Sequence, residues 1–272
     1  MAERKVVVIT GASGGIGAAL ARRLGAQGHA LVLAARRLDA LQAVARDASP
    51  EAVAVAADVT RRADVERVRD EALRAFGRVD VWVNNAGRGI TRPVLQLTDD
   101  DVDEMISVNV KSALYGMQAI VPHFVERGAG HLINVSSFLG RVPVASVRSV
   151  YSASKAALNS LTANLRMDLR QSAPGVHVSL VMPGLVATEF AANALGGAPP
   201  AVAPAAAAMG VQTADEVADA IAGLIEAPRA EIYTNPAMAA VPPRYYADVE
   251  AFESTMPTPP GPARPAAPPP GS

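Results

Sequence analysis

Short runs of apolar residues alternate along this chain with longer stretches that are apolar on one side only. Several runs are almost continuously apolar, which is typical of strands buried on both faces of a parallel sheet. Between the runs, apolar residues recur at helical spacing, as in Arg62–Phe76, and the pairs Thr98 with Asp101 and Thr213 with Glu216 resemble capped helix starts. The alternation predicts a single-domain, doubly wound α/β fold with a seven-stranded parallel sheet. The predicted strands are Val6–Ile9, Leu31–Ala35, Val53–Ala57, Val79–Val83, His131–Val135, His177–Met182 and Glu231–Thr234.

The chain divides into one folded region and a tail. Residues 1–250 carry the alternating pattern and are predicted to form the catalytic domain. Residues 196–209 are rich in Pro, Gly and Ala and interrupt the alternation, so a substrate loop over about 189–212 is predicted. A mobile lid or a variable surface insertion would both have this composition. Residues 251–272 are rich in proline and poor in large apolar residues, which predicts a disordered tail.

Composition and charge narrow the classes of function. The 25 Lys and Arg residues nearly balance the 26 Asp and Glu residues, so nothing favours general binding to nucleic acid or to an anionic membrane. The absence of cysteine excludes disulfides, thiolate metal sites and thiol nucleophiles. No pair of histidines has the spacing of a zinc site, and no metal is expected. Neither a signal peptide nor a membrane-spanning apolar run is recognisable, so we expect a cytoplasmic protein.

A glycine-rich turn follows the first predicted strand and opens the first predicted helix. Glycine permits a tight turn and close approach of the backbone to a ligand, and a helix N-terminus offers free N–H groups to a pyrophosphate. We therefore predict a bound dinucleotide rather than a merely structural turn. The same letters also match a G-x-S-x-G elbow, in which Ser13 would be a hydrolase nucleophile. The predicted nucleotide-binding residues of the turn are Gly11, Ser13, Gly14, Gly15, Ile16 and Gly17.

The end of the second strand selects the nucleotide. An acidic residue there usually holds the ribose 2′-hydroxyl of NAD, but this chain has Ala35 at that position. Arg36 and Arg37 follow and can hold a 2′-phosphate through charge-assisted hydrogen bonds. We expect NADP(H) in preference to NAD(H); the alternative is that the two arginines are a solvated pair at the start of a helix.

Tyr151 and Lys155 lie four residues apart in a stretch that is compatible with a helix. Residues at this spacing share one helix face, so the ammonium of Lys155 is expected beside the phenol of Tyr151. A fixed positive charge favours the phenolate and lowers a pKa that is otherwise near ~10. The pair is therefore a candidate general acid/base.

In combination, these segments resemble the short-chain dehydrogenase/reductase family over about residues 5–235. Thr10–Gly17 is similar to its TGxxxGxG turn, Asn84–Gly87 to its NNAG segment and Tyr151–Lys155 to its YxxxK segment. Pro183–Thr188 is similar to its PGxxxT segment, and Ser136 and Ser137 end the fifth strand, as in the family. The resemblance implies a Rossmann-like fold and a hydride transfer between a nicotinamide and an alcohol or ketone carbon.

The resemblance also implies roles for particular residues. Tyr151 would transfer a proton to or from the substrate oxygen, and Lys155 would lower the Tyr151 pKa and bind the nicotinamide ribose. Ser137 would hydrogen-bond the substrate oxygen; Ser136 points the other way along a strand, and Ser137 is nearer to the usual spacing. Asn109 would hold a water in a proton relay behind Lys155. The remaining expected cofactor contacts are Asp58, Val59, Asn85, Ala86, Gly87, Pro183, Gly184, Val186 and Thr188.

The substrate and the assembly are less closely defined. Apolar residues near the expected site, such as Leu139 and Phe190, favour a small lipophilic alcohol or ketone, although they are equally compatible with core or subunit contacts. The resemblance implies a homodimer or homotetramer, with the helices expected at Asp101–Phe124 and Tyr151–Arg170 as contact surfaces. A catalytically silent protein that senses nucleotide or acts as a scaffold on the same fold is the alternative to an enzyme.

Overall fold

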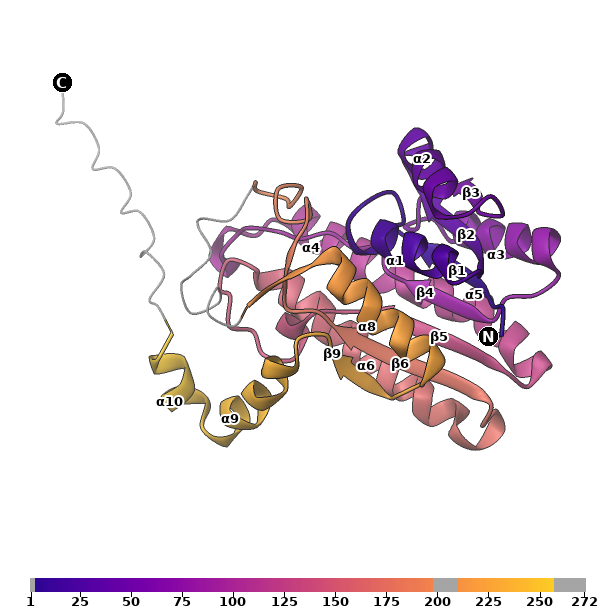
Figure 1. Ribbon diagram of the computed structural model, residues 1–272. Coiled ribbons are helices and arrows are strands. Elements are labelled where there is room, and N and C mark those ends of the chain that lie inside the picture. Colours follow the sequence, from indigo (N-terminus) through magenta and orange to yellow (C-terminus); the bar gives the residue numbers. More distant parts are fainter. Residues whose placement is uncertain (1–2, 198–209, 257–272) are drawn as a thin grey trace, which may run out of the picture.

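A seven-stranded parallel sheet forms the centre of the computed structural model, which describes residues 3–197 and 210–256 (Figure 1). The strand order is β3-β2-β1-β4-β5-β6-β9, and every neighbouring pair is parallel. All seven predicted strands are confirmed as members of this sheet. Their bounds are β1 (Val6–Thr10), β2 (Ala30–Ala35), β3 (Val53–Ala56), β4 (Val81–Asn84), β5 (Gly130–Val135), β6 (Val176–Met182) and β9 (Glu231–Tyr233).

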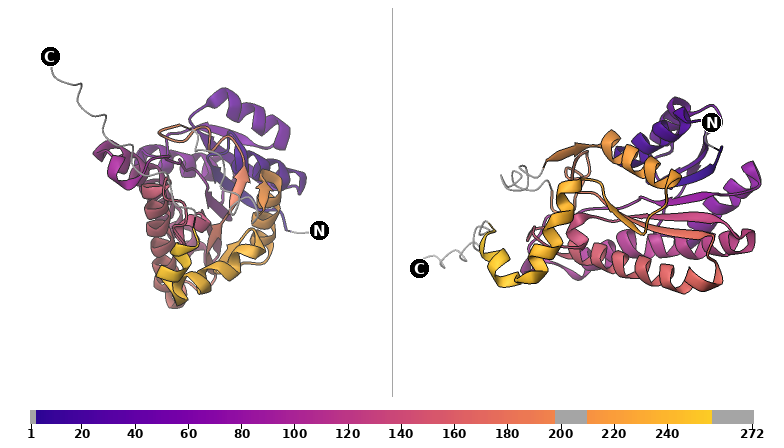
Figure 2. Two further views of the ribbon diagram at one scale, coloured as in Figure 1. Left: turned by 90° about the vertical axis from the view of Figure 1, so that its left-hand side faces the viewer. Right: turned by 60° about the horizontal axis from the view of Figure 1, so that its bottom comes forward.

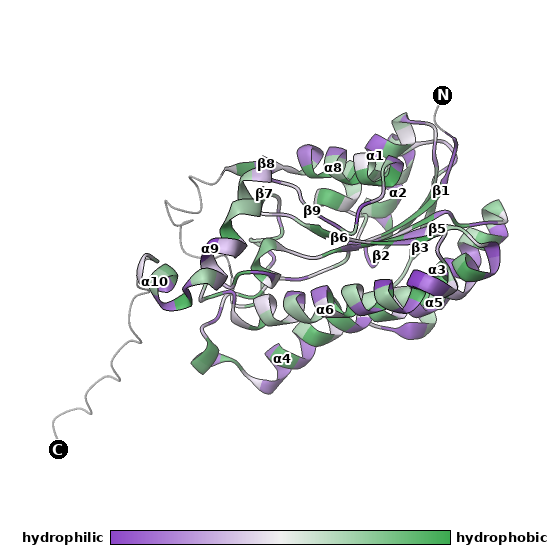
Figure 3. Ribbon diagram, turned by 90° about the horizontal axis from the view of Figure 1, so that it is seen from below, coloured by the Kyte–Doolittle hydropathy of each residue, from purple (hydrophilic) through white to green (hydrophobic). Residues whose placement is uncertain are grey.

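Helices cover both faces of the sheet, as Figure 3 shows with the strands lying between two helical layers. Side chains alternate between the two faces of a strand, so Val7 and Ile9 of β1 enter one core while Val8 enters the other. The first core contains α1 (Gly15–Ala26), α2 (Leu38–Ala48) and α8 (Ala214–Glu226). The second contains α3 (Arg62–Phe76), α5 (Ser112–Arg127) and α6 (Ser149–Ser172).

The predicted helix starts are confirmed. The Thr98 hydroxyl accepts a hydrogen bond from the Asp101 amide at the start of α4 (Asp99–Ile106), and the Asp101 carboxylate accepts one from the Thr98 amide. Thr213 and Glu216 form the same reciprocal pair at the start of α8. The single long helix expected at Asp101–Phe124 is instead interrupted. A π-helical turn, η2 (Ser107–Lys111), lies between α4 and α5 and contains Asn109.

The chain beyond the carboxyl ends of the strands forms several short elements. They are η1 (Val94–Gln96), η3 (Phe138–Gly140), β7 (Leu185–Ala187), β8 (Val211–Thr213) and η4 (Pro236–Ala240). The β7–β8 pair was not predicted, because three residues are too few to show a strand period. The sequence order of the strands reverses between β1 and β4, and ligands bind such sheets at this switch point, beyond the carboxyl ends.

The described chain ends in helical structure. Two short helices, α9 (Val241–Ala247) and α10 (Val249–Ser254), follow η4 at the end of the molecule away from the N-terminus (Figures 1 and 2). The Asp248 side chain caps α10, and Phe252 packs against Tyr245, so helical structure continues past residue 250. Residues 257–272 of the tail and residues 198–209 of the substrate loop lie outside the described residues. Among the helices that are described, none is long and apolar enough to cross a membrane.

Candidate active site

Tyr151 and Lys155 lie on one face of α6, as their spacing predicts. Both side chains are buried, with 7% and 3% of their surfaces exposed. The Lys155 Nζ lies 5.8 Å from the centre of the Tyr151 ring and donates a hydrogen bond of 3.0 Å to the Val135 carbonyl at the end of β5. The helix therefore holds an amine and a phenol together at the carboxyl end of the sheet.

Ser136 and Ser137 follow β5 and have different partners. The Ser137 hydroxyl is within hydrogen-bonding reach of Tyr151 and accepts a bond from the Leu139 amide. The Ser136 hydroxyl instead donates to the Asn159 Oδ1 at 2.5 Å and to the Lys155 carbonyl at 3.3 Å, inside the protein. The structure thus brings Ser137 to the phenol and turns Ser136 away, as alternation along a strand requires.

The pKa values at this site differ from the simple expectation. Burial raises the pKa of the Tyr151 phenol above its ordinary value, and a hydrogen bond from Ser137 and the charge of Arg148 oppose this rise. Burial also lowers the pKa of the Lys155 ammonium to about 8. We expected Lys155 to lower the phenol pKa; in the structure the net direction is upward, because removal from water disfavours the phenolate more than its neighbours favour it.

Asn109 is buried in the π-helical turn, and its side chain is fully engaged by the protein. Its Oδ1 accepts a hydrogen bond from the Arg88 amide at 2.9 Å, and its Nδ2 donates to the Arg88 carbonyl and to the Ser154 hydroxyl. A Cβ built on Gly87 would lie 3.1 Å from the Asn109 Oδ1 and 3.4 Å from the Lys155 Nζ. The asparagine therefore joins the segment after β4 to α6, and both hydrogens of its Nδ2 are donated to protein atoms.

The glycine turn fits the pyrophosphate of a dinucleotide. Gly14 precedes α1 without any side-chain cap, and the first turn of the helix carries no acidic residue. Its free N–H groups and positive dipole end are thus available to an anion. Among the described residues, a Cβ on Gly14 would meet only the Arg37 guanidinium, at 3.7 Å, so this part of the chain leaves the space above the backbone open. Gly11 has a positive φ of 67°, and a Cβ there would lie 2.8 Å from the Ala86 Cα.

The NNAG segment is hydrogen-bonded to this turn. The Thr10 hydroxyl accepts from the amides of Asn85 and Ala86 at 3.1 and 3.2 Å, and the Asn85 side chain donates to the Thr10 carbonyl at 2.9 Å. Asn84 instead lies in the core, where its Oδ1 accepts from the Trp82 indole and its Nδ2 donates to Asn134. The two segments therefore form one backbone surface across the switch point between β1 and β4.

The other predicted cofactor residues lie around the same end of the sheet. Arg36 and Arg37 are exposed after β2 and take part in no ion pair of the described chain. Asp58 accepts hydrogen bonds from the amide and hydroxyl of Thr60, a turn-forming role that engages its Oδ1 only. Val59 packs against the second core.

The Pro183–Thr188 segment crosses back toward the glycine turn. The Pro183 carbonyl accepts from the Phe138 amide at 2.8 Å, and the Gly184 backbone lies against the Met238 side chain. Val186 lies in β7, and the Thr188 Cγ2 is 3.5 Å from a Cβ built on Gly15. The last contact places Thr188 beside the N-terminus of α1.

Three loop segments that are distant in sequence form a small ladder beside Tyr151. The Thr91 amide donates to the Leu195 carbonyl, the Leu195 amide donates to the Gly89 carbonyl, and the Arg92 amide donates to the Val147 carbonyl, at 2.7 to 2.9 Å. The ladder carries the Phe190 ring, whose centre lies 5.6 Å from that of Tyr151, and the Arg148 guanidinium. Arg148 was not predicted from the sequence. It lies three residues before Tyr151, but it precedes the first residue of α6, so helical spacing does not predict where its side chain points.

The hydrolase alternative lacks a partner for Ser13. All four histidines lie at or near the opposite, amino-terminal end of the sheet: His29 precedes β2, His131 and His177 begin β5 and β6, and His123 accepts from the Val79 amide. Ser13 follows the carboxyl end of β1, so it has no histidine base. Within the described residues, no cluster of three or more His, Asp or Glu side chains could hold a metal ion.

Comparisons with known proteins agree with this geometry. Residues 5–196 match the short chain dehydrogenase family. An uncharacterized oxidoreductase of Staphylococcus epidermidis is 36% identical over 186 residues, which cover 68% of this chain and 80% of that protein. A short-chain dehydrogenase/reductase from Burkholderia phymatum in complex with NAD is 32% identical with a TM-score of 0.81, covering 95% of this chain and 98% of that one. An alcohol dehydrogenase from Thermococcus sibiricus complexed with 5-hydroxy-NADP is 30% identical with a TM-score of 0.73, covering 85% and 96%.

Proposed function

Since this chain belongs to the short-chain dehydrogenase family of oxidoreductases, we propose that it moves a hydride between NADP(H) and the carbon of an alcohol or ketone. The observation that carries the proposal is the grouping of Tyr151, Lys155 and Ser137 at the same end of the sheet as the uncapped N-terminus of α1. When bound, the nicotinamide supplies or accepts the hydride. The protein supplies orientation and the proton.

In the direction of reduction, the hydroxyls of Ser137 and Tyr151 donate hydrogen bonds to the substrate oxygen. Tyr151 then transfers its proton to that oxygen as the carbon is reduced, and a phenolate remains until solvent returns the proton. Oxidation of an alcohol runs through the same groups in reverse. The raised pKa of the Tyr151 phenol keeps it protonated before reduction, and Lys155 supplies a cation one helical turn away that favours the phenolate once it forms.

The preference for NADP(H) is a second part of the proposal. Arg36 and Arg37 follow β2 without an acidic partner in the described chain, and Ala35 stands where the ribose-binding acid is expected. Two free guanidinium groups favour a 2′-phosphate over a 2′-hydroxyl. We further propose a small-molecule substrate, a cytoplasmic location and a homodimer or homotetramer, on the sequence grounds given above.

The decisive experiment compares wild type with Tyr151→Phe. The variant keeps the ring but loses the transferable proton, so we expect kcat to fall by about 10²- to 10⁴-fold against a panel of alcohols and ketones. NADPH affinity, measured by fluorescence titration, should stay within about twofold, and the melting temperature should not fall.

Equal turnover by wild type and Tyr151→Phe would contradict the proposed role of the phenol. Tight NADPH binding by wild type without turnover of any compound would support the catalytically silent sensor in place of the enzyme.

A further inference from the structure

Arg148 is a half-buried cation without an acidic partner in the part of the chain that the structure describes. Two other arginines near the same loop ladder are each paired with a carboxylate. Arg88 pairs with Glu104, and Arg92 pairs with Asp101 at 2.7 Å. The Arg148 Nη1 donates a hydrogen bond of 3.1 Å to the Ile90 carbonyl.

The stretches outside the described residues add no acidic side chain. Residues 1–2, 198–209 and 257–272 contain no Asp or Glu. Burial lowers the pKa of the Arg148 guanidinium from its ordinary value, which marks the cost of withdrawing the cation from water. A guanidinium has five N–H donors, and one carbonyl cannot satisfy them. The charge therefore stands at this site without an acidic side chain.

The guanidinium lies on the same wall of the site as Tyr151 and Phe190. A Cβ built on Gly89 would be 2.8 Å from the Arg148 Nη1 and 3.0 Å from the Phe190 Cε1, so the glycine leaves room for both groups. Phe190 is in ring contact with Tyr151, and the charge of Arg148 acts on the Tyr151 phenol. A substrate whose oxygen contacts Tyr151 would thus lie close to this cation.

We propose that Arg148 binds a carboxylate of the substrate, so that hydroxy acids and oxo acids are preferred over neutral alcohols and ketones. The inference rests on the proposed function, because it concerns the same site. A planar guanidinium matches the two oxygens of a carboxylate, and the adjoining Phe190 ring suits an apolar remainder of the molecule. The lipophilic substrate favoured by the sequence then becomes an amphipathic one, with an acid group at the Arg148 end.

A merely structural role for Arg148 is the competing explanation, because its bond to Ile90 also supports the ladder. The two explanations differ in one measurable respect. Loss of a carboxylate contact lowers kcat/KM for acids only, whereas loss of support for the ladder lowers it equally for acids and for neutral analogues.

The experiment therefore measures kcat/KM for short 2- and 3-oxo acids and for their methyl esters with NADPH at fixed ionic strength. Wild type should prefer each acid to its ester by about tenfold or more. Arg148→Gln should lower kcat/KM for the acids by about 10- to 100-fold, mainly through KM, and leave the esters within about threefold. Arg148→Lys should retain part of the preference. Arg88→Gln, which removes a paired cation near the same ladder, should leave the acid-to-ester ratio unchanged.

Two results would overturn the inference while the proposed function stands. One is an acid-to-ester ratio that is the same in wild type and Arg148→Gln; the other is an equal loss for both compounds. If wild type turns over neither, the broad panel of alcohols and ketones tests the proposed function, and calorimetric titration of the acids and esters into the protein with NADP⁺ tests the carboxylate site separately. Binding of acids alone that Arg148→Gln abolishes supports the carboxylate site, and binding without that selectivity contradicts it.

Discussion

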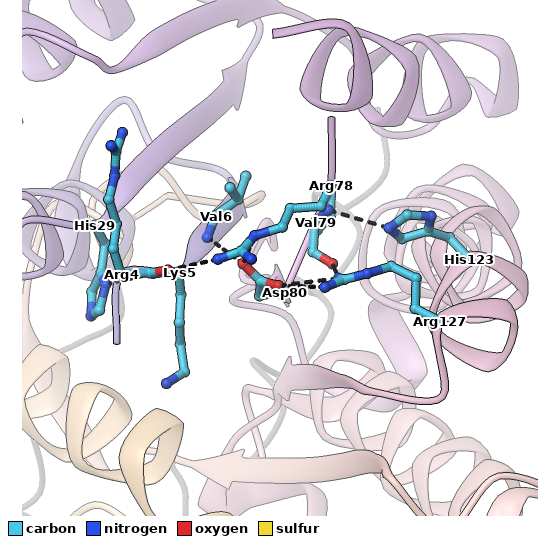
Figure 4. A network of polar contacts seen from close by, with 9 residues as sticks. All are labelled: Arg4, Lys5, Val6, His29, Arg78, Val79, Asp80, His123 and Arg127. Carbon is cyan, nitrogen blue, oxygen red and sulfur yellow. Dashed lines mark hydrogen bonds and ion pairs between the residues drawn. The ribbon is translucent and has the colours of Figure 1, made fainter. Parts of the chain in front are cut away.

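Asp80 and its two arginines at one end of the central sheet are paired with each other, whereas four cations at the other end have no acidic partner among the described residues. At the amino ends of β1 and β4, the Asp80 carboxylate accepts from the Val6 amide at 2.7 Å and pairs with Arg78 and Arg127 at 3.1 Å each (Figure 4). We call Asp80, Arg78, Arg127 and the Val6 amide the Asp80 clamp. At the carboxyl ends, Lys155, Arg148, Arg36 and Arg37 form no ion pair within the described chain.

This difference assigns stability to the amino end of the sheet and ligand binding to the carboxyl end. Charges in the Asp80 clamp are satisfied by the protein and connect the first strand to the loop before β4 and to α5. At the other end, Lys155, Arg148, Arg36 and Arg37 have no acidic partner in the described chain, although Arg88 and Arg92 are paired there. Anions of a dinucleotide or a substrate are the partners that the four unpaired cations lack.

Lys155→Met should lose activity and gain stability. The amine supports the Tyr151 phenolate, so we expect kcat to fall by about 10²- to 10³-fold. Because burial lowers the pKa of Lys155 to about 8, the unfolded chain holds this proton more tightly than the folded one, and stability of the wild type rises between about pH 8 and pH 10.5. At pH 7 the variant should therefore unfold at higher urea concentration, with a gain of up to about 3 kcal/mol. A variant that is less stable at pH 7 would contradict a cost for the buried charge.

Asp80→Asn should have the reverse effect. The amide keeps the shape of the carboxylate but loses the charge that pairs with Arg78 and Arg127, so we expect unfolding free energy to fall by about 2 kcal/mol. Urea denaturation measures this loss. Turnover per folded molecule and NADPH affinity should stay unchanged, since the clamp is at the opposite end from Tyr151. A fall in kcat without a fall in unfolding free energy would contradict a purely stabilising role for the Asp80 clamp.

His131 should make the amino end sensitive to acid. Burial lowers its pKa to about 3, so the unfolded chain takes up a proton below about pH 6.5 while the folded protein does not. Stability is full above pH 6.5 and falls as the pH drops toward 3, by about 2 kcal/mol at pH 5. His131→Gln, which keeps a hydrogen-bonding group for Ser179, should show a shallower loss between pH 6.5 and pH 5. Equal slopes for the two proteins would remove His131 as the cause.

Arg36 and Arg37 should decide between the two nucleotides. Replacing both by serine removes the cations at the end of β2, and we expect NADPH affinity to fall by about tenfold or more with NADH affinity unchanged. Fluorescence titration with each nucleotide measures the ratio. The double variant Arg22→Ser and Arg23→Ser on the outer surface of α1 is the matched control, since these arginines pair with Asp47 and Asp219. An equal loss for NADPH and NADH would contradict a phosphate contact.

Elements with a regular local pattern were predicted from the sequence, and elements that depend on contacts were not. Each strand, the helices α3 and α6, and the starts of α4 and α8 were predicted within a few residues, because local period and capping are properties of neighbouring residues. The π-helical turn at Asn109 was missed, since the apolar pattern of α4 and α5 passes through it without a break. The pair β7–β8 and the helix α10 were missed because short elements depend on their contacts more than on their period.

The sequence by itself determined the order of the elements and the approach of Lys155 to Tyr151, because one helical turn fixes the distance between residues four apart. Only the tertiary structure decided that Ser137 rather than Ser136 contacts the phenol. It also decided that the Asn109 amide donates to the Arg88 carbonyl, and that Arg148 lies beside Phe190 without an acidic partner in the described chain. These facts depend on loops from distant parts of the chain packing against one another, and no local pattern encodes which side chains then find partners.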